Sequence, residues 1–140
     1  MTPRRPTIGT AVDDAPDREA DDVDEIRLTV PALADYARVV RLAISGLASR
    51  NGFAYDEVED IRIAIGELFG ILVATADATT RLRFSTHLSD DGLTVRAERV
   101  PATTIPSPSE LSEQILAGVV GGAAVDTDRG AIEVTKRFSS

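Results

Sequence analysis

The sequence of 140 residues contains no cysteine and no tryptophan, and its one histidine is His87. The absence of cysteine excludes disulfides, thiolate metal sites and cysteine nucleophiles. His87 has no second histidine or cysteine with which to share a metal, so we interpret it as a surface or strand-packing residue. Aromatic residues make up only 4% of the chain, so the core must be built from aliphatic side chains.

Long apolar runs are also missing. None approaches the length of a membrane span, and the N-terminus lacks the order of a signal peptide. These absences predict a cytoplasmic protein with no membrane partner. The net charge of -8 argues against nucleic acid as a partner, because such binders carry a cationic surface. There is no P-loop, no GxGxxG motif and no nucleophile elbow, so the raw material for catalysis is thin.

Much of the acidity lies in residues 1–24, which also contain Pro3, Pro6 and Pro16 and few large apolar side chains. Such a segment cannot bury enough surface to offset its ordering entropy, so we predict a disordered acidic arm over residues 1–24. Residues 25–140 then form one domain, which suits a chain of this length. We interpret the arm as a solubilising tail, with contact to a partner as the alternative.

Hydrophobic periodicity predicts the first three elements of the domain. A strand at 26–30 precedes a helix at about 33–49, which Asn51-Gly52 ends. A second helix runs to about residue 77, with Asp56 as its N-cap and Glu59 completing a capping box.

The second half of the chain is expected to hold most of the strands. Strands at 81–88 and 93–100 flank a tight hairpin turn. A third helix begins with Ser107 as its N-cap, and strands at 123–126 and 132–136 follow it. This order predicts an α/β (α+β) two-layer sandwich, a mixed and mostly antiparallel sheet with three helices on one face.

Two polar positions on the predicted helices are candidates for function. Glu67 lies among apolar neighbours one turn away, so its carboxylate can point outward, pair with an arginine or line a pocket. From the residues alone we favour a structural role. On the first helix Arg38, with Arg41 and Ser45, falls opposite the apolar stripe, which predicts that Arg38 is exposed and is either a solvated charge or an interface anchor.

Three segments, at 36–39, 60–68 and 130–136, resemble the anti-sigma-factor serine kinases of bacteria. The similarity extends from about residue 26 to residue 138, and it is the ordered set of segments that carries it. The resemblance implies the histidine-kinase-like ATPase fold. It also implies a regulator that binds a sigma factor and the anti-anti-sigma protein that competes for it.

The resemblance further implies which residues would serve catalysis. Glu67 matches the family's general base, but Ile71 stands where an asparagine would help to hold Mg²⁺. Ala97 stands where an aspartate would read adenine, and Arg99 where a glycine follows it. The segment 106–109, which replaces the glycine-rich lid, contains no glycine. We therefore expect no ATP or Mg²⁺ cofactor and interpret Glu67 as a vestigial catalytic residue.

The sequence thus predicts an anti-sigma-type transcription regulator that sequesters a sigma factor without catalysis. Its predicted partner-binding residues are Tyr36, Arg38, Arg41 and Ser45, and a homodimer is expected from the resemblance. The alternative is an active protein-serine kinase that uses ATP, Mg²⁺ and Glu67 to phosphorylate a STAS-domain anti-anti-sigma protein. A small adaptor without a sigma partner is a third possibility.

Overall fold

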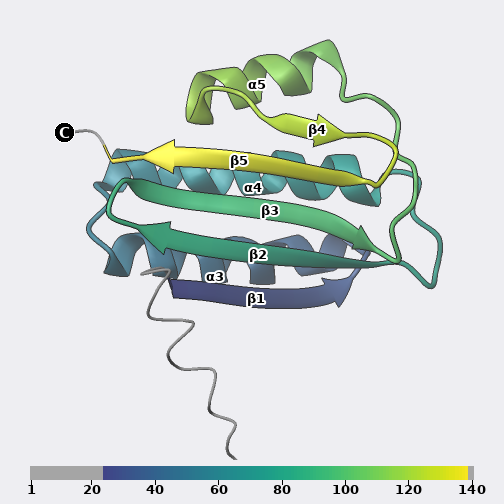
Figure 1. The fold of residues 1–140 in the computed structure, drawn as a ribbon, viewed down its shortest axis with the longest axis horizontal. Coiled ribbons are helices and arrows are strands. Elements are labelled where there is room, and N and C mark those ends of the chain that lie inside the picture. Colours follow the sequence, from purple (N-terminus) through teal and green to yellow (C-terminus); the bar gives the residue numbers. More distant parts are fainter. Residues whose placement is uncertain (1–23, 139–140) are drawn as a thin grey trace, which may run out of the picture.

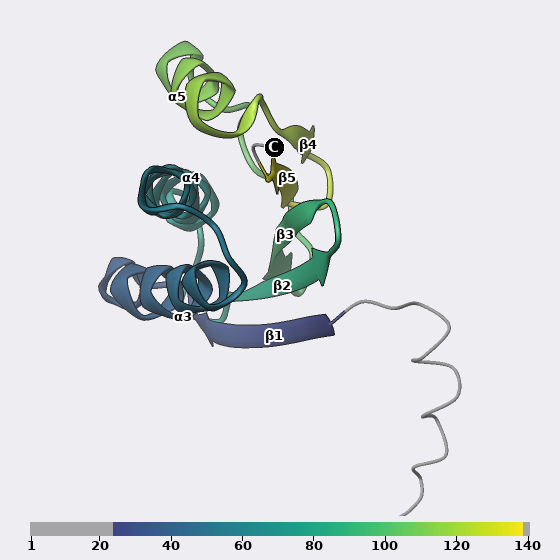
Figure 2. The ribbon, with the colours of Figure 1, turned by 90° about the vertical axis from the view of Figure 1, so that its left-hand side faces the viewer.

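A five-stranded antiparallel sheet forms one layer of the protein, and three helices cover one of its faces (Figure 1 and Figure 2). The structure is a computed structural model that describes residues 24–138. Residues 1–23 of the predicted arm lie outside the described residues, and Asp24, the last residue assigned to the arm, is the first residue of the first strand.

The elements follow the predicted order along the chain. They are β1 (Asp24–Pro31), the short 3-10 turn η1 (Ala34–Tyr36), α3 (Ala37–Arg50), α4 (Tyr55–Val73), β2 (Arg81–Ser89), β3 (Gly92–Val100), α5 (Glu110–Val120), β4 (Ala124–Asp126) and β5 (Ala131–Arg137). The strands lie in the order β1-β2-β3-β5-β4, and every neighbouring pair is antiparallel. The two-layer sandwich with three helices on one face is confirmed, and among the described residues the sheet is antiparallel throughout.

The helix ends differ from the predicted ones. The α4 helix begins with Ala54 as its N-cap, whose amide donates to Glu57 Oε1 over 2.8 Å, so the predicted capping by Asp56 and Glu59 is wrong. The helix also ends at Val73 rather than near residue 77. The N-cap of α5 is Ser109 instead of Ser107, because the Ser109 hydroxyl accepts a hydrogen bond from the Ser112 amide over 3.0 Å.

The core lies between the two layers and is mainly aliphatic, as the scarcity of aromatic residues predicts. The apolar stripe of α4, formed by Ile61, Ile65, Leu68 and Leu72, is buried against the sheet. Phe69 and Phe84 stack within the core with their ring centroids 5.9 Å apart. Burying such a stripe is what fixes α4 on the sheet, since each large aliphatic side chain contributes about 1.5–3 kcal/mol when removed from water.

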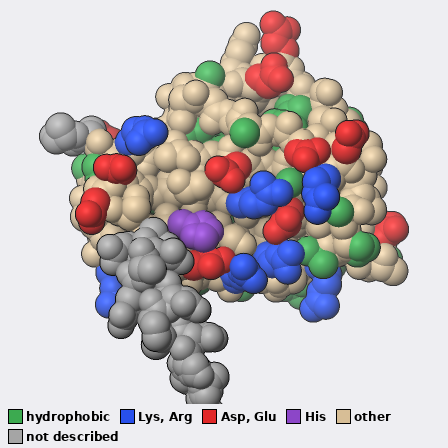
Figure 3. All heavy atoms as spheres, in the orientation of Figure 1, with side chains coloured by type: hydrophobic (Ala, Val, Ile, Leu, Met, Phe, Trp, Pro, Cys, Tyr) green, Lys and Arg blue, Asp and Glu red, His purple; other side chains and the backbone are tan. Residues whose placement is uncertain are grey.

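The other face of the sheet is open and carries charges of both signs (Figure 3). Glu98 pairs with Arg83 over 3.3 Å and with Arg96 over 3.7 Å, and Arg96 also approaches Glu133. His87 lies on this face, where its Nε2 is 3.9 Å from Glu25, so its interpretation as a surface residue is confirmed. Several of the charges on this face are thus paired with one another.

Candidate functional site

A pocket of about 280 Å³ lies between α4 and the loop that leads into α5. It is lined by Gly66, Glu67, Gly70, Ile71, Ala74, Pro106, Ser107, Pro108, Ser109 and Ser112. The pocket brings together Glu67, Ile71 and the segment 106–109, three of the positions that the sequence singled out. This pocket is therefore the candidate site for catalysis or ligand binding.

Glu67 is half-buried in the wall of this pocket. No side chain within residues 24–138 forms a hydrogen bond or an ion pair with its carboxylate. The prediction that Glu67 has a structural role, for example in a pair with an arginine, therefore has no support in its contacts. A carboxylate without a partner in a pocket is available to a ligand or to another protein.

Arg99 anchors the chain shortly before the loop segment that lines the pocket. This side chain is only 4% exposed, and its guanidinium reaches two separate segments. Toward the end of α4, Nε donates to the Leu72 carbonyl and Nη2 to the Thr75 hydroxyl, each over 2.9 Å. Toward the loop after β3, Nη1 donates over 3.1 Å to both the Thr103 hydroxyl and the Thr104 carbonyl. Arg99 thus joins the loop before α5 to the end of α4.

No carboxylate of the described chain forms an ion pair with Arg99. Its guanidinium instead donates hydrogen bonds to carbonyl and hydroxyl oxygens at the end of α4 and in the loop. Burial lowers the pKa of Arg99, and the charge of Asp77 opposes that shift. Hydrogen bonds from the Thr79 hydroxyl, the Thr79 amide and the Thr80 hydroxyl in turn lower the pKa of Asp77, so that carboxylate stays ionised. The partly negative end of α4 at Leu72 also favours the cation.

Mg²⁺ and ATP do not fit the residues that are present. Ile71 lines the pocket with a hydrocarbon side chain, and Ala97 is fully buried in the core, where it can offer no polar contact to a base. None of the lining residues is a lysine or an arginine that could hold phosphates.

A second candidate surface lies on α3 around Arg38. Arg38 is exposed, as predicted, and no group in the described chain pairs with it. It lines a hollow of about 430 Å³ together with Ala34, Asp35, Val39 and Arg41. Large apolar side chains are exposed beside it, with Val39 at 47% and Leu42 at 67%.

The other predicted partner-binding residues differ in their exposure. Tyr36 is exposed at the start of α3, whereas Arg41 is half-buried, with Nη1 3.5 Å from the position that a Cβ on Gly66 would take. The placement of Ser45 on the exposed face is wrong, because Ser45 is buried and its hydroxyl donates to the Arg41 carbonyl. A serine hydroxyl that donates to the carbonyl one turn back along its own helix already has a hydrogen-bond partner, so it can be buried.

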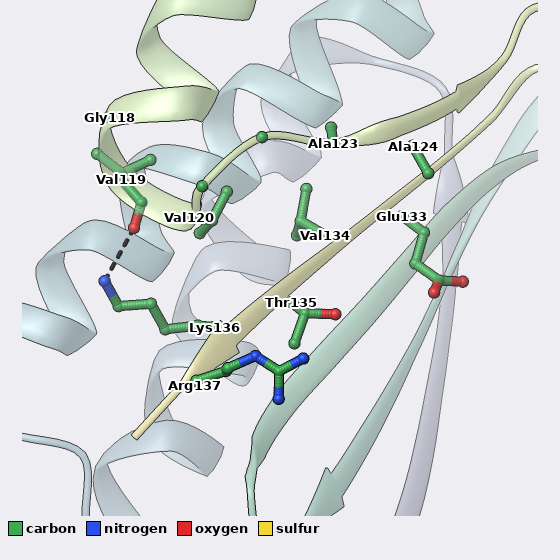
Figure 4. Close-up of a pocket in the computed structure, with 12 residues that line it drawn as sticks. Gly118, Val119, Val120, Ala123, Ala124, Glu133, Val134, Thr135, Lys136 and Arg137 are labelled. Carbon is green, nitrogen blue, oxygen red and sulfur yellow. Dashed lines mark hydrogen bonds between the residues drawn. The ribbon is translucent and has the colours of Figure 1, made fainter. Parts of the chain in front are cut away.

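A larger hollow of about 750 Å³ lies on the far side of α5, between its last turn and β5 (Figure 4). Two cations line it. Lys136 is already satisfied, because its Nζ donates to the Val119 carbonyl over 2.9 Å and to Asp60 over 3.0 Å, whereas Arg137 is exposed. Small side chains and the pair Gly121-Gly122 line much of the rest, and none of the predicted site residues lies there.

Comparison with known proteins tests the resemblance. No protein-family model matches the chain. It is 40% identical over 73 residues to the serine-protein kinase RsbW of Halalkalibacterium halodurans, a match that covers 51% of this chain and 45% of the relative. It is 48% identical over 44 residues to the RsbW of Bacillus cereus strain AH187, covering 31% of this chain and 28% of the relative. The family resemblance is confirmed.

A solved structure confirms the fold. The crystal structure of the RsbU and RsbW domains of Rv1364c from Mycobacterium tuberculosis matches with a TM-score of 0.62 at 17% identity, over 82% of this chain and 32% of that chain. The predicted histidine-kinase-like fold is therefore correct. The chain spans less than half the length of the curated RsbW relatives it matches, so their activity is not carried over to it.

Two further findings concern other kinds of site. Within residues 24–138, no group of three or more histidine, cysteine, aspartate or glutamate side chains is placed to hold a metal ion. Over the same residues, no helix combines the length and the apolar character that crossing a membrane requires. The features that stand out are thus the Glu67 pocket, the Arg99 contacts behind it and the α3 surface around Arg38.

Proposed function

We propose that this chain is an anti-sigma-type regulator that captures a sigma factor through the α3 surface and does not catalyse phosphoryl transfer. The observation that carries the proposal is Arg38, an exposed arginine without a partner, set beside the exposed apolar side chains Val39 and Leu42. An arginine with an apolar surround is a common anchor of protein interfaces, whereas an isolated apolar patch of this kind costs solubility.

The proposal also covers the competing protein, the oligomeric state and the location. A STAS-domain anti-anti-sigma protein would compete for the same surface, and a homodimer and a cytoplasmic location accompany the function. Support comes from the RsbW relatives and from the absence, within residues 24–138, of a helix fit to cross a membrane.

The alternative of an active serine kinase has one observation in its favour, since Glu67 lines a pocket and its carboxylate has no partner. A base alone does not transfer a phosphoryl group, because charge on the phosphates must also be neutralised. Ile71, the buried Ala97 and the absence of a lining cation all count against the alternative.

Substitution of Arg38 tests the proposal. Arg38→Ala should weaken capture of a purified cognate sigma factor by about 1–2 kcal/mol, which is roughly five- to thirtyfold in Kd, because an interface arginine is lost. Thermal stability should be unchanged, since Arg38 is exposed and makes no contact that folding needs. Titration calorimetry measures the affinity.

The matched control is Arg50→Ala, which removes an exposed arginine at the other end of α3. It should leave capture as it was. Equal affinities of the Arg38→Ala variant and the unmodified protein would show that the α3 surface is not the docking surface.

A further inference from the structure

The Glu67 pocket contains polar groups that no residue of the described chain uses. The carboxylate of Glu67 has no partner, and neither has the hydroxyl of Ser107 or of Ser112. Each wall also carries apolar groups, with Ile71 and Ala74 on the α4 side and Pro108 on the loop side. Acceptor groups beside hydrocarbon suit a ligand that has a cationic head on an aliphatic stem, as lysine and arginine have.

The charge around the pocket favours a cation over an anion. The N-terminus of α5 would by itself attract an anion, but Ser109 caps it and its first turn holds Glu110 and Glu113. Arg41, whose guanidinium lies against Gly66, forms no ion pair with Glu67. A phosphate would meet these carboxylates without a lining lysine or arginine to balance them.

The pocket also continues into the proposed docking surface. Arg41 lines the hollow beside Arg38, and its Nη1 lies 3.5 Å from the position of a Cβ on Gly66, which lines the Glu67 pocket. A protein that covers the α3 surface therefore has the pocket within reach of a long side chain. Arg99 joins Thr103 and Thr104, which shortly precede the lining segment 106–109, to the end of α4, and this anchors the start of that loop.

We propose that the Glu67 pocket receives a lysine or arginine side chain of the partner protein, with Glu67 as the counter-ion and Ser107 and Ser112 as further acceptors. This inference rests on the proposed function, since the side chain belongs to the protein that docks on α3. The site that in an ATP-binding relative would hold a nucleotide thus becomes part of the protein interface.

Small probes test the pocket without a partner. The full chain is titrated with N-acetyl-lysine methylamide and with N-acetyl-arginine methylamide at millimolar concentrations, while the amide resonances of Gly66, Gly70, Ser109 and Ser112 are followed by NMR. Saturable shifts of these resonances that disappear in Glu67→Gln support the proposal. N-acetyl-norleucine methylamide, which has the stem without the charge, should leave them unmoved.

Two outcomes of this titration overturn the inference. In one, inorganic phosphate shifts the four resonances and the cationic probes do not, which would make the pocket an anion site. In the other, no probe shifts them, or the norleucine derivative shifts them equally. Glu67→Gln preserves shape and removes only the charge, so the folded variant serves as a direct control.

Capture of the partner separates this inference from the proposed function. Glu67→Gln should weaken capture of the sigma factor at least about tenfold, because hydrogen bonds to a charged group are lost. Glu133→Gln, which makes the same charge change on the open face of the sheet, should have little effect. If Arg38→Ala weakens capture and Glu67→Gln does not, the pocket inference is wrong and the α3 docking surface stands. If neither substitution weakens it, the docking proposal itself fails.

Discussion

Arg99 is the residue whose role could least be foreseen. In the sequence it appears only as a departure from a glycine position, yet its guanidinium joins the end of α4 to the loop at Thr103 and Thr104. The observed position of Glu67 was among the predictions, because lining a pocket was one of the three options for its carboxylate. Spacing along one helix could not show which option holds, because the opposite wall comes from residues forty positions away.

Replacing Arg99 by methionine should lower the free energy of unfolding by at least about 2 kcal/mol. The substitution leaves the Leu72 carbonyl without this donor in a buried site, which costs about 1–3 kcal/mol, and it also removes the partly buried bonds to Thr75, Thr103 and Thr104. Arg99→Lys should recover only part of the loss, because one ammonium group cannot reach both segments at once. Urea unfolding of the three proteins measures the difference, and a methionine variant as stable as the unmodified protein would refute the role assigned to Arg99.

At the scale of elements, the periodic patterns were sufficient to place the helices and strands but not their ends. The N-cap of α4 lies two residues before the predicted one because Phe53 is buried and stacks on Phe138, with ring centroids 4.3 Å apart. The entry to α5 is set in the same way by Ile105, which is buried and whose amide donates to the Thr127 carbonyl. Both anchors are tertiary contacts, so the local pattern of serines and acids could not reveal them.

Two glycines in different elements should respond to alanine with opposite signs. Gly46 lies inside α3 with open space where a Cβ would be, so Gly46→Ala should stabilise the protein by about 0.5–1 kcal/mol. Gly92 begins β3 with a φ of 155°, and a Cβ there would clash with the Lys136 carbonyl, so Gly92→Ala should destabilise it by more than about 1 kcal/mol. Thermal or urea unfolding of both variants checks the pair. Changes of the same sign would contradict the assignment.

The molecule as a whole was predictable to the level of its layers, because alternation and helical periodicity both report which side of each element is buried. The sequence also left the open face of the sheet unspecified, since the pairing of Arg83, Arg96 and Glu98 depends on strand register. The composition gives the total charge but not which charges of this face pair with one another.

Mg-ATP should not stabilise the full chain. A ligand that binds the folded state at 100 times its Kd adds about 2.7 kcal/mol, which would raise the melting temperature by several degrees. With Ile71 in the pocket and no cation lining it, we expect the melting temperature to be the same with and without millimolar Mg-ATP. Differential scanning calorimetry gives the comparison. A clear rise would restore the kinase alternative and remove the basis for a non-catalytic regulator.

The contacts of Arg99 have a consequence for how such a regulator would be controlled. A loop that a nucleotide orders reports the energy state of the cell, because its order rises and falls with the supply of that nucleotide. Here the group that binds the loop at Thr103 and Thr104 belongs to β3, so these contacts require no nucleotide. We expect the release of a partner to follow the abundance of competing proteins and to be blind to the ratio of ATP to ADP.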